Sequence, residues 1–302
     1  MKIAFTSDIH YDITEGNKQL LPYLSAEVAE RCPDVFIIAG DVANSLGTLH
    51  EALSAFNTLS GRRLFVPGNH DLWIESKNAV KKRKEDSWWR YRTGIPEVCE
   101  ENGFEYLPRN PVVIDGVGFV GSAGWYDYSL RDPRLDDVFW SSDYARGEFV
   151  DSRFIRGILN DVRRTCWLKY PESSDWRTRL CKETTQEVFQ RMLDELKADV
   201  AAVMEQIQTL VVIVHTNPFA ACIQRKEPAD PFDAYEGSTR LGKTLVQYAQ
   251  KTRVTCICGH RHKPLDITVD GVRVLRTAVG YLENFNGQYR EQAAAAVGMI
   301  DV

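Results

Sequence analysis

At residues 35–41 the chain reads Val35-Phe36-Ile37-Ile38-Ala39-Gly40-Asp41, five apolar residues followed at once by a glycine and a carboxylate. An apolar run of this length, without polar alternation, is typical of a strand whose two faces are both covered. Runs of the same kind occur at residues 3–5, 64–66, 210–214 and 254–258. The sequence therefore predicts several strands of a sheet that is buried on both sides.

Helical patterns lie between several of these predicted strands. Leu21, Leu24 and Val28 keep the spacing that places apolar side chains on one face of a helix, and residues 189–207 continue such a pattern over a longer segment. Strands that alternate with helices indicate βαβ units with parallel pairing. The predicted fold class is therefore α/β.

Two Asp-Gly pairs, Asp115-Gly116 and Asp270-Gly271, each lie between two apolar runs. They predict hairpin turns, because glycine tolerates the positive φ of a tight two-residue turn. Residues 294–302 are predicted to form a last strand. The sheets should therefore combine parallel and antiparallel pairs.

The composition is that of a globular protein. The 302 residues are 44% hydrophobic and 26% charged, which excludes disordered and fibrous architectures. The net charge of −5 argues against a protein that coats polyanions. The length permits one large domain or two small ones.

The sequence gives no indication of export or of a membrane partner. The apolar run before Asp8 is too short for a signal peptide, and no stretch approaches the roughly 18 apolar residues of a membrane helix. The seven cysteines are scattered and odd in number, so we expect reduced thiols and a cytoplasmic protein. Cys256 and Cys258 fit two buried strand residues better than a metal-binding pair.

Residues 126–179 interrupt the regular pattern. Ten acidic and ten basic residues are interleaved there with ten aromatic ones, without sustained periodicity. We interpret this part, called here the 126–179 segment, as an insertion or cap within one domain that spans residues 1–302. The alternative is a few short helices that cover the outside of the core.

Side chains that can bind metal follow the predicted strands at their carboxyl ends, where open α/β sheets place ligand sites. They lie in five motifs: Asp8-x-His10, Gly40-Asp41, Gly68-Asn69-His70-Asp71, His215 and Gly259-His260-Arg261-His262. Taken singly, each residue has an ordinary explanation as a turn residue, a helix cap or a hydrogen-bonded histidine. These explanations do not account for the placement of all these residues at one edge of the sheet. Carboxylate, imidazole and amide ligands together suit Mn, Fe, Zn, Co or Ni.

These motifs, in this order, resemble the pattern of the calcineurin-like metallophosphoesterase superfamily. The resemblance implies a two-layer β-sandwich of mixed sheets flanked by helices, with two divalent or trivalent transition-metal ions at the strand ends. By motif match, the first ion would be held by Asp8, His10 and His262, the second by Asn69, His215 and His260, with Asp41 bridging the two. His70 would be the catalytic residue.

Asn44 narrows this resemblance. Asn44-Ser45 stands where serine/threonine protein phosphatases carry Asp-Arg-Gly, so that branch is disfavoured. An asparagine at this position also puts in doubt an Asp–His pair that would raise the basicity of His70. Asp71 is the alternative orienting residue.

The leading hypothesis is a metal-dependent hydrolase of phosphate esters, either a phosphodiesterase or a phosphatase on a small organic phosphate. In-line attack by a metal-bridging hydroxide would be assisted by His70, which stabilises the transition state or protonates the leaving oxygen. A nuclease is an alternative, because residues 77–92 combine seven cations with Trp88, Trp89 and Tyr91. We favour instead a charged helix face with inward-packed aromatics. A non-catalytic protein-binding scaffold is disfavoured, because every ligand position is intact.

Substrate contacts are predicted from position alone. The residues after Gly121-Ser122-Ala123-Gly124 could line the substrate pocket, and Arg261 could contact phosphate. Packing of the segment on the core, and an exposed loop arginine, are the alternatives. His50 matches no motif and is predicted to be solvated. The candidate pocket residues are Trp125, Tyr126, Tyr128, Arg131 and Arg134.

Overall fold

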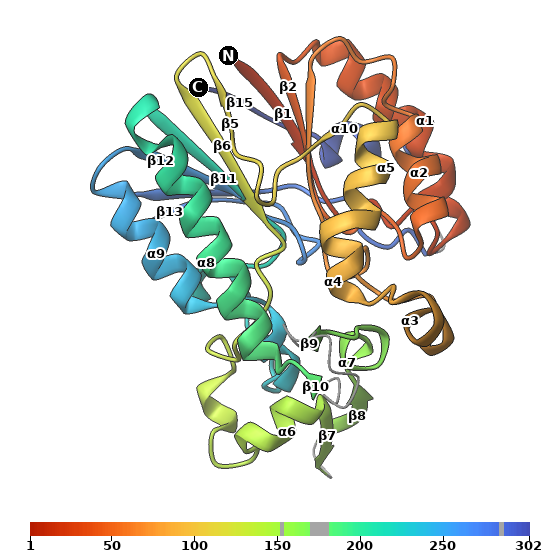
Figure 1. The fold of residues 1–302 in the computed structure, drawn as a ribbon, viewed down its shortest axis with the longest axis vertical. Helices are drawn as coiled ribbons and strands as arrows, with labels where there is room; N and C mark the ends of the chain where they lie inside the picture. The colour runs from red at the N-terminus through yellow and green to blue at the C-terminus, as the bar shows by residue number, and fades with distance from the viewer. Residues whose placement is uncertain (152–153, 170–180, 284–286) are drawn as a thin grey trace.

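The computed structural model describes residues 1–151, 154–169, 181–283 and 287–302. Two β-sheets face each other, and helices cover the outer face of each (Figure 1). This is the predicted two-layer sandwich of mixed sheets flanked by helices.

The first sheet has the strand order β15-β1-β2-β3-β4. Strands β1 to β4 run parallel to one another, and the edge strand β15 pairs antiparallel with β1. The bounds are β1 (Lys2–Thr6), β2 (Val35–Ala39), β3 (Arg62–Val66), β4 (Glu105–Tyr106) and β15 (Gly298–Asp301).

The second sheet has the order β13-β14-β12-β11-β6-β5. Strands β14, β12, β11 and β6 are parallel, whereas β13 and β5 pair antiparallel with their hairpin partners. The bounds are β5 (Val112–Ile114), β6 (Val117–Ser122), β11 (Thr209–Val214), β12 (Arg253–Ile257), β13 (Leu265–Val269) and β14 (Val272–Arg276).

Helices cover both outer faces (Figure 1). Those beside the first sheet are α1 (Glu15–Arg31), α2 (Leu46–Ser54), α5 (Ile95–Glu101) and α10 (Tyr289–Ala296). Those beside the second sheet are α8 (Thr185–Val203) and α9 (Thr239–Ala249). Thr184 caps α8 by accepting a hydrogen bond from the backbone N–H of Glu187, and the Glu187 carboxylate accepts one from the backbone N–H of Thr184. In the described part of the chain, no helix is both long enough and apolar enough to span a bilayer.

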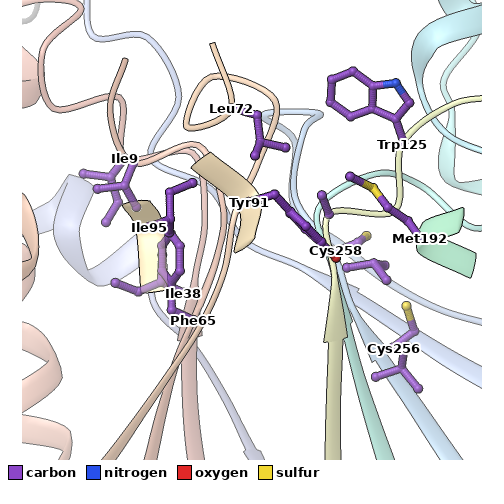
Figure 2. Close-up of a cluster of buried hydrophobic side chains, with 14 of the residues drawn as sticks. Ile9, Ile38, Phe65, Leu72, Tyr91, Ile95, Trp125, Met192, Cys256 and Cys258 are labelled. Carbon is purple, nitrogen blue, oxygen red and sulfur yellow. The ribbon is translucent and has the colours of Figure 1, made fainter. Parts of the chain in front are cut away.

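The core follows from strands that are buried on both faces. In β2, Val35, Ile37 and Ala39 pack between the sheets, and Phe36 and Ile38 face the helices. Figure 2 shows Ile38 and Phe65 of the first sheet on one side of the core. On the other side lie Met192 of α8 and, from the second sheet and its end, Cys256 and Cys258. Each strand therefore contributes to two apolar layers, which explains its continuous apolar run.

Short elements lie beyond the carboxyl ends of the strands, in the lower part of Figure 1. They include α3 (Lys77–Arg83), α4 (Ser87–Trp89), α6 (Ser141–Arg146), β7 (Glu148–Asp151), β8 (Phe154–Ile158), α7 (Asn160–Arg164), β9 (Leu168–Lys169) and β10 (Cys181–Lys182). The parts 152–153 and 170–180 of the 126–179 segment lie outside the described residues. Helical turns complete the chain: η1 (Arg90–Gly94), η2 (Pro133–Leu135), η3 (Met204–Gln206), η4 (Ala220–Cys222) and η5 (Pro231–Tyr235).

The hairpin predictions are confirmed. Asp115 and Gly116 have φ values of 47° and 78°, and Asp270 and Gly271 have 47° and 85°, as a turn with two positive φ angles requires.

Two boundaries differ from prediction. Helix α8 ends at Val203, before the end of the 189–207 pattern, and the last strand begins only at Gly298. The prediction for residues 294–297 was wrong because Ala293 to Ala296, strong helix formers, end α10 instead.

Candidate metal centre

The predicted ligands and His70 follow the ends of five strands. Asp8 and His10 follow β1, Asp41 follows β2, Asn69 and His70 follow β3, His215 follows β11, and His260 and His262 follow β12. The first six are buried, and His260 and His262 are half-buried. The structure thus brings all eight predicted residues together where the ends of both sheets meet.

The backbone at this edge takes an uncommon conformation. Asp8, His10, Asp41 and His260 have φ values of 53°, 49°, 57° and 69°. Side chains other than glycine rarely adopt this left-handed region, and such residues concentrate at functional sites. The conformation turns each chain sharply after its strand and directs the side chain into the site.

Glycine 68 is required by close packing within the site. A Cβ atom at this position would lie 2.5 Å from the backbone nitrogen of Asp41 and 2.8 Å from its Cγ. The backbone of the Gly68-Asn69-His70 loop therefore lies directly against the carboxylate that the motif match places between two ions.

The side-chain donors form two groups. In the first, His10 Nε2 lies 3.1 Å from His262 Nε2 and 3.9 Å from Asp8 Oδ1. In the second, Asn69 Oδ1 lies 3.1 Å from His215 Nε2 and 3.0 Å from His260 Nδ1.

Asp41 lies between the groups. Its Oδ2 is 3.3 Å from His215 Nε2 in the second group and 3.9 Å from His10 Nε2 in the first. One carboxylate therefore reaches both positions, as a bridging ligand must.

These distances fit bound cations. The nitrogens of His260 and His215 face each other at 3.2 Å, as do those of His10 and His262 at 3.1 Å. Two ligands at right angles, each about 2.1 Å from one ion, lie about 3.0 Å apart. A cation placed between each facing pair would be bound by both nitrogens, so the donor sets suit metal ions.

Hydrogen bonds fix the ligands in place. His215 Nδ1 donates to the carbonyl oxygen of Ala39 at 2.8 Å, so Nε2 is the nitrogen directed into the site. Asp8 accepts from the backbone N–H of His260, and Asp41 Oδ1 accepts from that of His70 at 2.8 Å.

The electrostatics favour a cation. Burial lowers the pKa of His10 and of His260 to about 3, so both are neutral donors at neutral pH. Burial alone would raise the pKa of Asp8, but the His262 hydrogen bond and nearby histidine charges lower it to about 2. Burial likewise opposes the charge on His215, but Asp41 raises its pKa to about 10, so this imidazole must release a proton when a cation binds.

His70 is oriented by Asn44. His70 Nδ1 donates to Asn44 Oδ1 at 2.9 Å, and Asn44 Nδ2 in turn donates to Asp12 Oδ1 at 3.0 Å. This leaves His70 Nε2 facing the site, 4.0 Å from Asp41 Oδ2, while its ring packs against Trp73 with centroids 3.7 Å apart and planes tilted by 32°. An amide therefore takes the place of the carboxylate of an Asp–His pair.

The suggestion that Asp71 orients His70 was wrong. The Asp71 carboxylate accepts backbone N–H groups of Gly68, Asp41, Val42 and Ala43 at 2.8 to 3.0 Å. It therefore ties the loop after β3 to the loop after β2. Burial and the Asp41 charge raise the pKa of this carboxyl to about 7.

The predicted substrate contacts have other partners. Trp125 and Tyr126 are 2% and 1% exposed, and their rings stack on each other, so neither presents a face to a substrate in this structure. Packing on the core, the alternative explanation, describes both. Arg131 pairs with Asp136, and Arg261 lies within 3.4 Å of carboxylate oxygens of Asp233 and Glu236. Substrate contact by these two arginines stays a prediction.

Two residues of the site were missed. Tyr281 is 48% exposed, its hydroxyl lies 3.4 Å from His70 Nε2, and its ring centroid lies 4.6 Å from those of His10 and His262. Asp161, in the 126–179 segment, accepts a hydrogen bond from Asn69 Nδ2 at 3.0 Å. Neither residue belongs to a motif, and the sequence holds no signal that would have identified them.

The other motifs lie outside the site. Trp88 and Tyr91 are buried and Trp89 is half-buried, so the aromatics of residues 77–92 pack inward as favoured. His50 is exposed and lies beside Glu101. Among the described residues, the groups that could hold a metal contain no cysteine.

Comparison with known proteins agrees with this geometry. Residues 1–264 match the family model described as Calcineurin-like phosphoesterase. The [Acyl-carrier-protein] phosphodiesterase PptH of Mycobacterium tuberculosis is 25% identical over 283 residues, which cover 91% of this chain and 76% of that protein.

Solved structures share the fold. Phosphopantetheinyl Hydrolase (PptH) from Mycobacterium tuberculosis superposes with a TM-score of 0.63 at 20% identity, covering 99% of this chain and 95% of that one. A dimetal phosphatase from Danio rerio superposes with a TM-score of 0.50 at 13% identity, covering 91% and 86%.

Proposed function

Because the chain belongs to the calcineurin-like phosphoesterase family, it is a metal-dependent hydrolase of phosphoric ester bonds, and we propose that it acts on organic phosphodiesters. It does not belong to the serine/threonine protein phosphatase branch. The observation that supports the proposal most strongly is the pair of donor groups that share Asp41.

We propose that two transition-metal ions occupy these groups. Asp8, His10 and His262 would hold the first ion, Asn69, His215 and His260 the second, and Asp41 would contact both. When bound, such ions lower the pKa of a water molecule and neutralise charge on the phosphoryl oxygens. The mixture of imidazole, carboxylate and amide ligands supports Mn, Fe, Zn, Co or Ni.

In this proposal His70 donates a proton to the leaving group. Asn44 Oδ1 accepts a hydrogen bond from His70 Nδ1–H, so Nε2 is the nitrogen that faces the substrate. When the phosphorus–oxygen bond breaks, a proton held at Nε2 passes to the leaving alkoxide. This matters most for esters whose leaving group is a poor one.

The substrate class rests on the relative. A protein that is 25% identical over 91% of this chain bears the name [Acyl-carrier-protein] phosphodiesterase, which supports a phosphodiester attached to a carrier protein rather than a free monoester. A nuclease is less well supported, because Trp88 and Tyr91 are buried and cannot stack on bases. A scaffold is less well supported because all the metal donors and His70 are present and converge.

Three of the predictions stay proposals. We propose that residues 1–302 are one domain with the 126–179 segment inserted in it. We also propose that Arg131 and Arg261 contact the substrate once it is bound. The cytoplasmic location is supported by six of the seven cysteines, which are free thiols.

The proposal is tested by metal analysis and by parallel assays. Purified protein reconstituted with Mn, Fe, Zn, Co or Ni is expected to bind two ions per chain and to hydrolyse aryl phosphodiesters. Acyl carrier protein that carries a phosphopantetheine arm is expected to lose that arm, and mass spectrometry would detect the loss. Fewer than one bound ion per chain, together with no hydrolysis of any ester, would refute the proposed metal-dependent activity. A preference for monoesters would refute the diester proposal alone.

The role of His70 needs two variants. His70→Ala is expected to lower kcat about 100-fold or more on alkyl diesters and much less on aryl diesters, whose leaving groups need no proton. His50→Ala, which changes an exposed histidine outside the site, serves as the matched control and should retain full activity. Equal losses on both kinds of ester would contradict proton donation by His70.

A further inference from the structure

Asp161 is a buried carboxylate that joins the 126–179 segment to the metal centre. It lies on α7, is 4% exposed, and accepts three hydrogen bonds. Asn69 Nδ2 donates at 3.0 Å and Trp73 Nε1 at 2.5 Å, both to Oδ1, while the Tyr126 hydroxyl donates to Oδ2 at 2.6 Å. The loop after β3 and Tyr126 therefore both donate hydrogen bonds to one carboxylate.

The hydrogen bond to Asn69 decides which end of its amide faces the metal donors. An amide has an oxygen that can bind a cation and an NH₂ group that cannot. A carboxylate only accepts hydrogen bonds, so Asp161 holds the NH₂ group of Asn69 and excludes the flipped orientation. Asn69 Oδ1 is thereby directed towards His215 Nε2 and His260 Nδ1, at 3.1 and 3.0 Å.

The other two bonds hold Asp161 itself in place. Trp73 packs against His70 and lies in the loop that follows the Asn69 motif. Tyr126 is 1% exposed and packs against Trp125 and Tyr235. Since each donor is buried and fixed by packing, the carboxylate has little freedom to turn away from Asn69.

We propose that Asp161 is a positioning residue for the second metal position, acting through the amide of Asn69. The inference rests on the proposed metal centre and assigns a function to the 126–179 segment, which supplies a part of the site that no motif contains. Partners of this kind, which orient a ligand without touching the ion, typically change metal affinity by 10- to 100-fold when removed.

The test compares variants by metal binding. Asp161→Ala and Asp161→Leu both remove the acceptor, and leucine also fills the space that alanine would leave empty. Asp161→Asn keeps an oxygen that can accept from Asn69 and Trp73. Tyr126→Phe is the matched control, because it removes only the bond to Oδ2, while Trp73 still holds the carboxylate and the bond to Asn69 remains. Equilibrium dialysis against Mn²⁺ with metal analysis gives the affinity of each position, and circular dichroism and Tm report folding.

The expected result is selective. Asp161→Ala and Asp161→Leu should lose at least 10-fold in Mn²⁺ affinity at one of the two positions, whereas Asp161→Asn and Tyr126→Phe should stay within about threefold of wild type. In the Asn69→Ala background, Asp161→Leu should cause no further loss, since its effect passes through the missing amide. A structural role alone would not produce that dependence on Asn69.

Three outcomes would overturn the inference. Folded acceptor-free variants with wild-type Mn²⁺ affinity would do so, as would an equal loss with and without Asn69. If neither acceptor-free variant folds, the carboxylate is needed for the fold itself and the positioning role is refuted. Each outcome leaves the proposed function intact as long as wild-type protein binds two ions. Wild-type protein that binds no metal would instead refute the proposed function.

Discussion

Replacing Gly68 by alanine tests whether the loop after β3 must lie against Asp41. The new Cβ would be 2.5 Å from the Asp41 backbone nitrogen, whereas ordinary contact begins near 3.4 Å. The loop must therefore retreat by about 1 Å, which lengthens the 2.8 Å bonds from His70 N–H to Asp41 and from Gly68 N–H to Asp71. Overpacking of this kind costs about 1–3 kcal/mol, and the displaced Asn69 should lower metal affinity at least about 10-fold.

Gly116→Ala is the matched control. Gly116 lies in a hairpin turn outside the metal centre, with φ of +78°, and an added Cβ would meet nothing within 4 Å. Its substitution should cost only the left-handed strain of about 1–2 kcal/mol and leave metal binding unchanged.

Urea denaturation with and without chelator, together with metal analysis, separates the two variants. Gly68→Ala should lose both stability and bound metal, and the stabilisation that metal gives should shrink. If Gly68→Ala binds as much metal as Gly116→Ala, the argument from close packing is wrong.

Three further changes test other contacts. Asn44→Asp would place a second carboxylate about 3 Å from Asp12, where an amide now donates at 3.0 Å, so we expect the free energy of unfolding to fall by about 1–3 kcal/mol at pH 8. The double variant Asp12→Asn/Asn44→Asp should recover this loss, and unchanged urea midpoints would contradict the expectation. Tyr281→Phe removes the hydroxyl 3.4 Å from His70 Nε2 and should lower kcat/KM about three- to tenfold with metal content unchanged, whereas wild-type kinetics would show that the hydroxyl has no part in the reaction. Burial raises the pKa of Asp199 to about 6, so the folded protein binds more protons than the unfolded chain between pH 4 and 6 and loses stability as pH rises through that window. Asp199→Asn should remove this loss and, with solvent screening of the charge, be more stable than wild type above pH 6 by about 1 kcal/mol; parallel stability profiles of the two proteins would contradict this.

The strands and the convergence of the candidate ligands could be predicted because both depend on local patterns. An apolar run such as Val35 to Ala39 forms a strand that is buried on both faces, and the residue after it, such as Asp41, must then lie at the sheet edge. Parallel pairing brings the carboxyl ends of neighbouring strands together, so residues far apart in sequence, such as Asp8 after β1 and Asp41 after β2, meet at one edge of the sheet.

The remaining contacts depend on tertiary packing. Asp12 meets Asn44, and Tyr281 meets His70, only because loops from different strands lie side by side. The sequence leaves Trp125 open between a pocket wall and the core, because exposure cannot be inferred from a position after a strand, and the structure buries it. Asp161 lies in a segment without periodicity, so no pattern located it.

The left-handed backbone of His10 and His260 bears on attempts to make the protein more heat-resistant. Glycine or asparagine relieves the strain of a positive φ, so a library selected for stability alone will enrich these residues at both positions. Each such variant replaces the imidazole of a candidate metal ligand, and its gain in the unfolding temperature conceals any loss of metal affinity. Engineering for stability should therefore exclude both positions from diversification and select on retained metal instead.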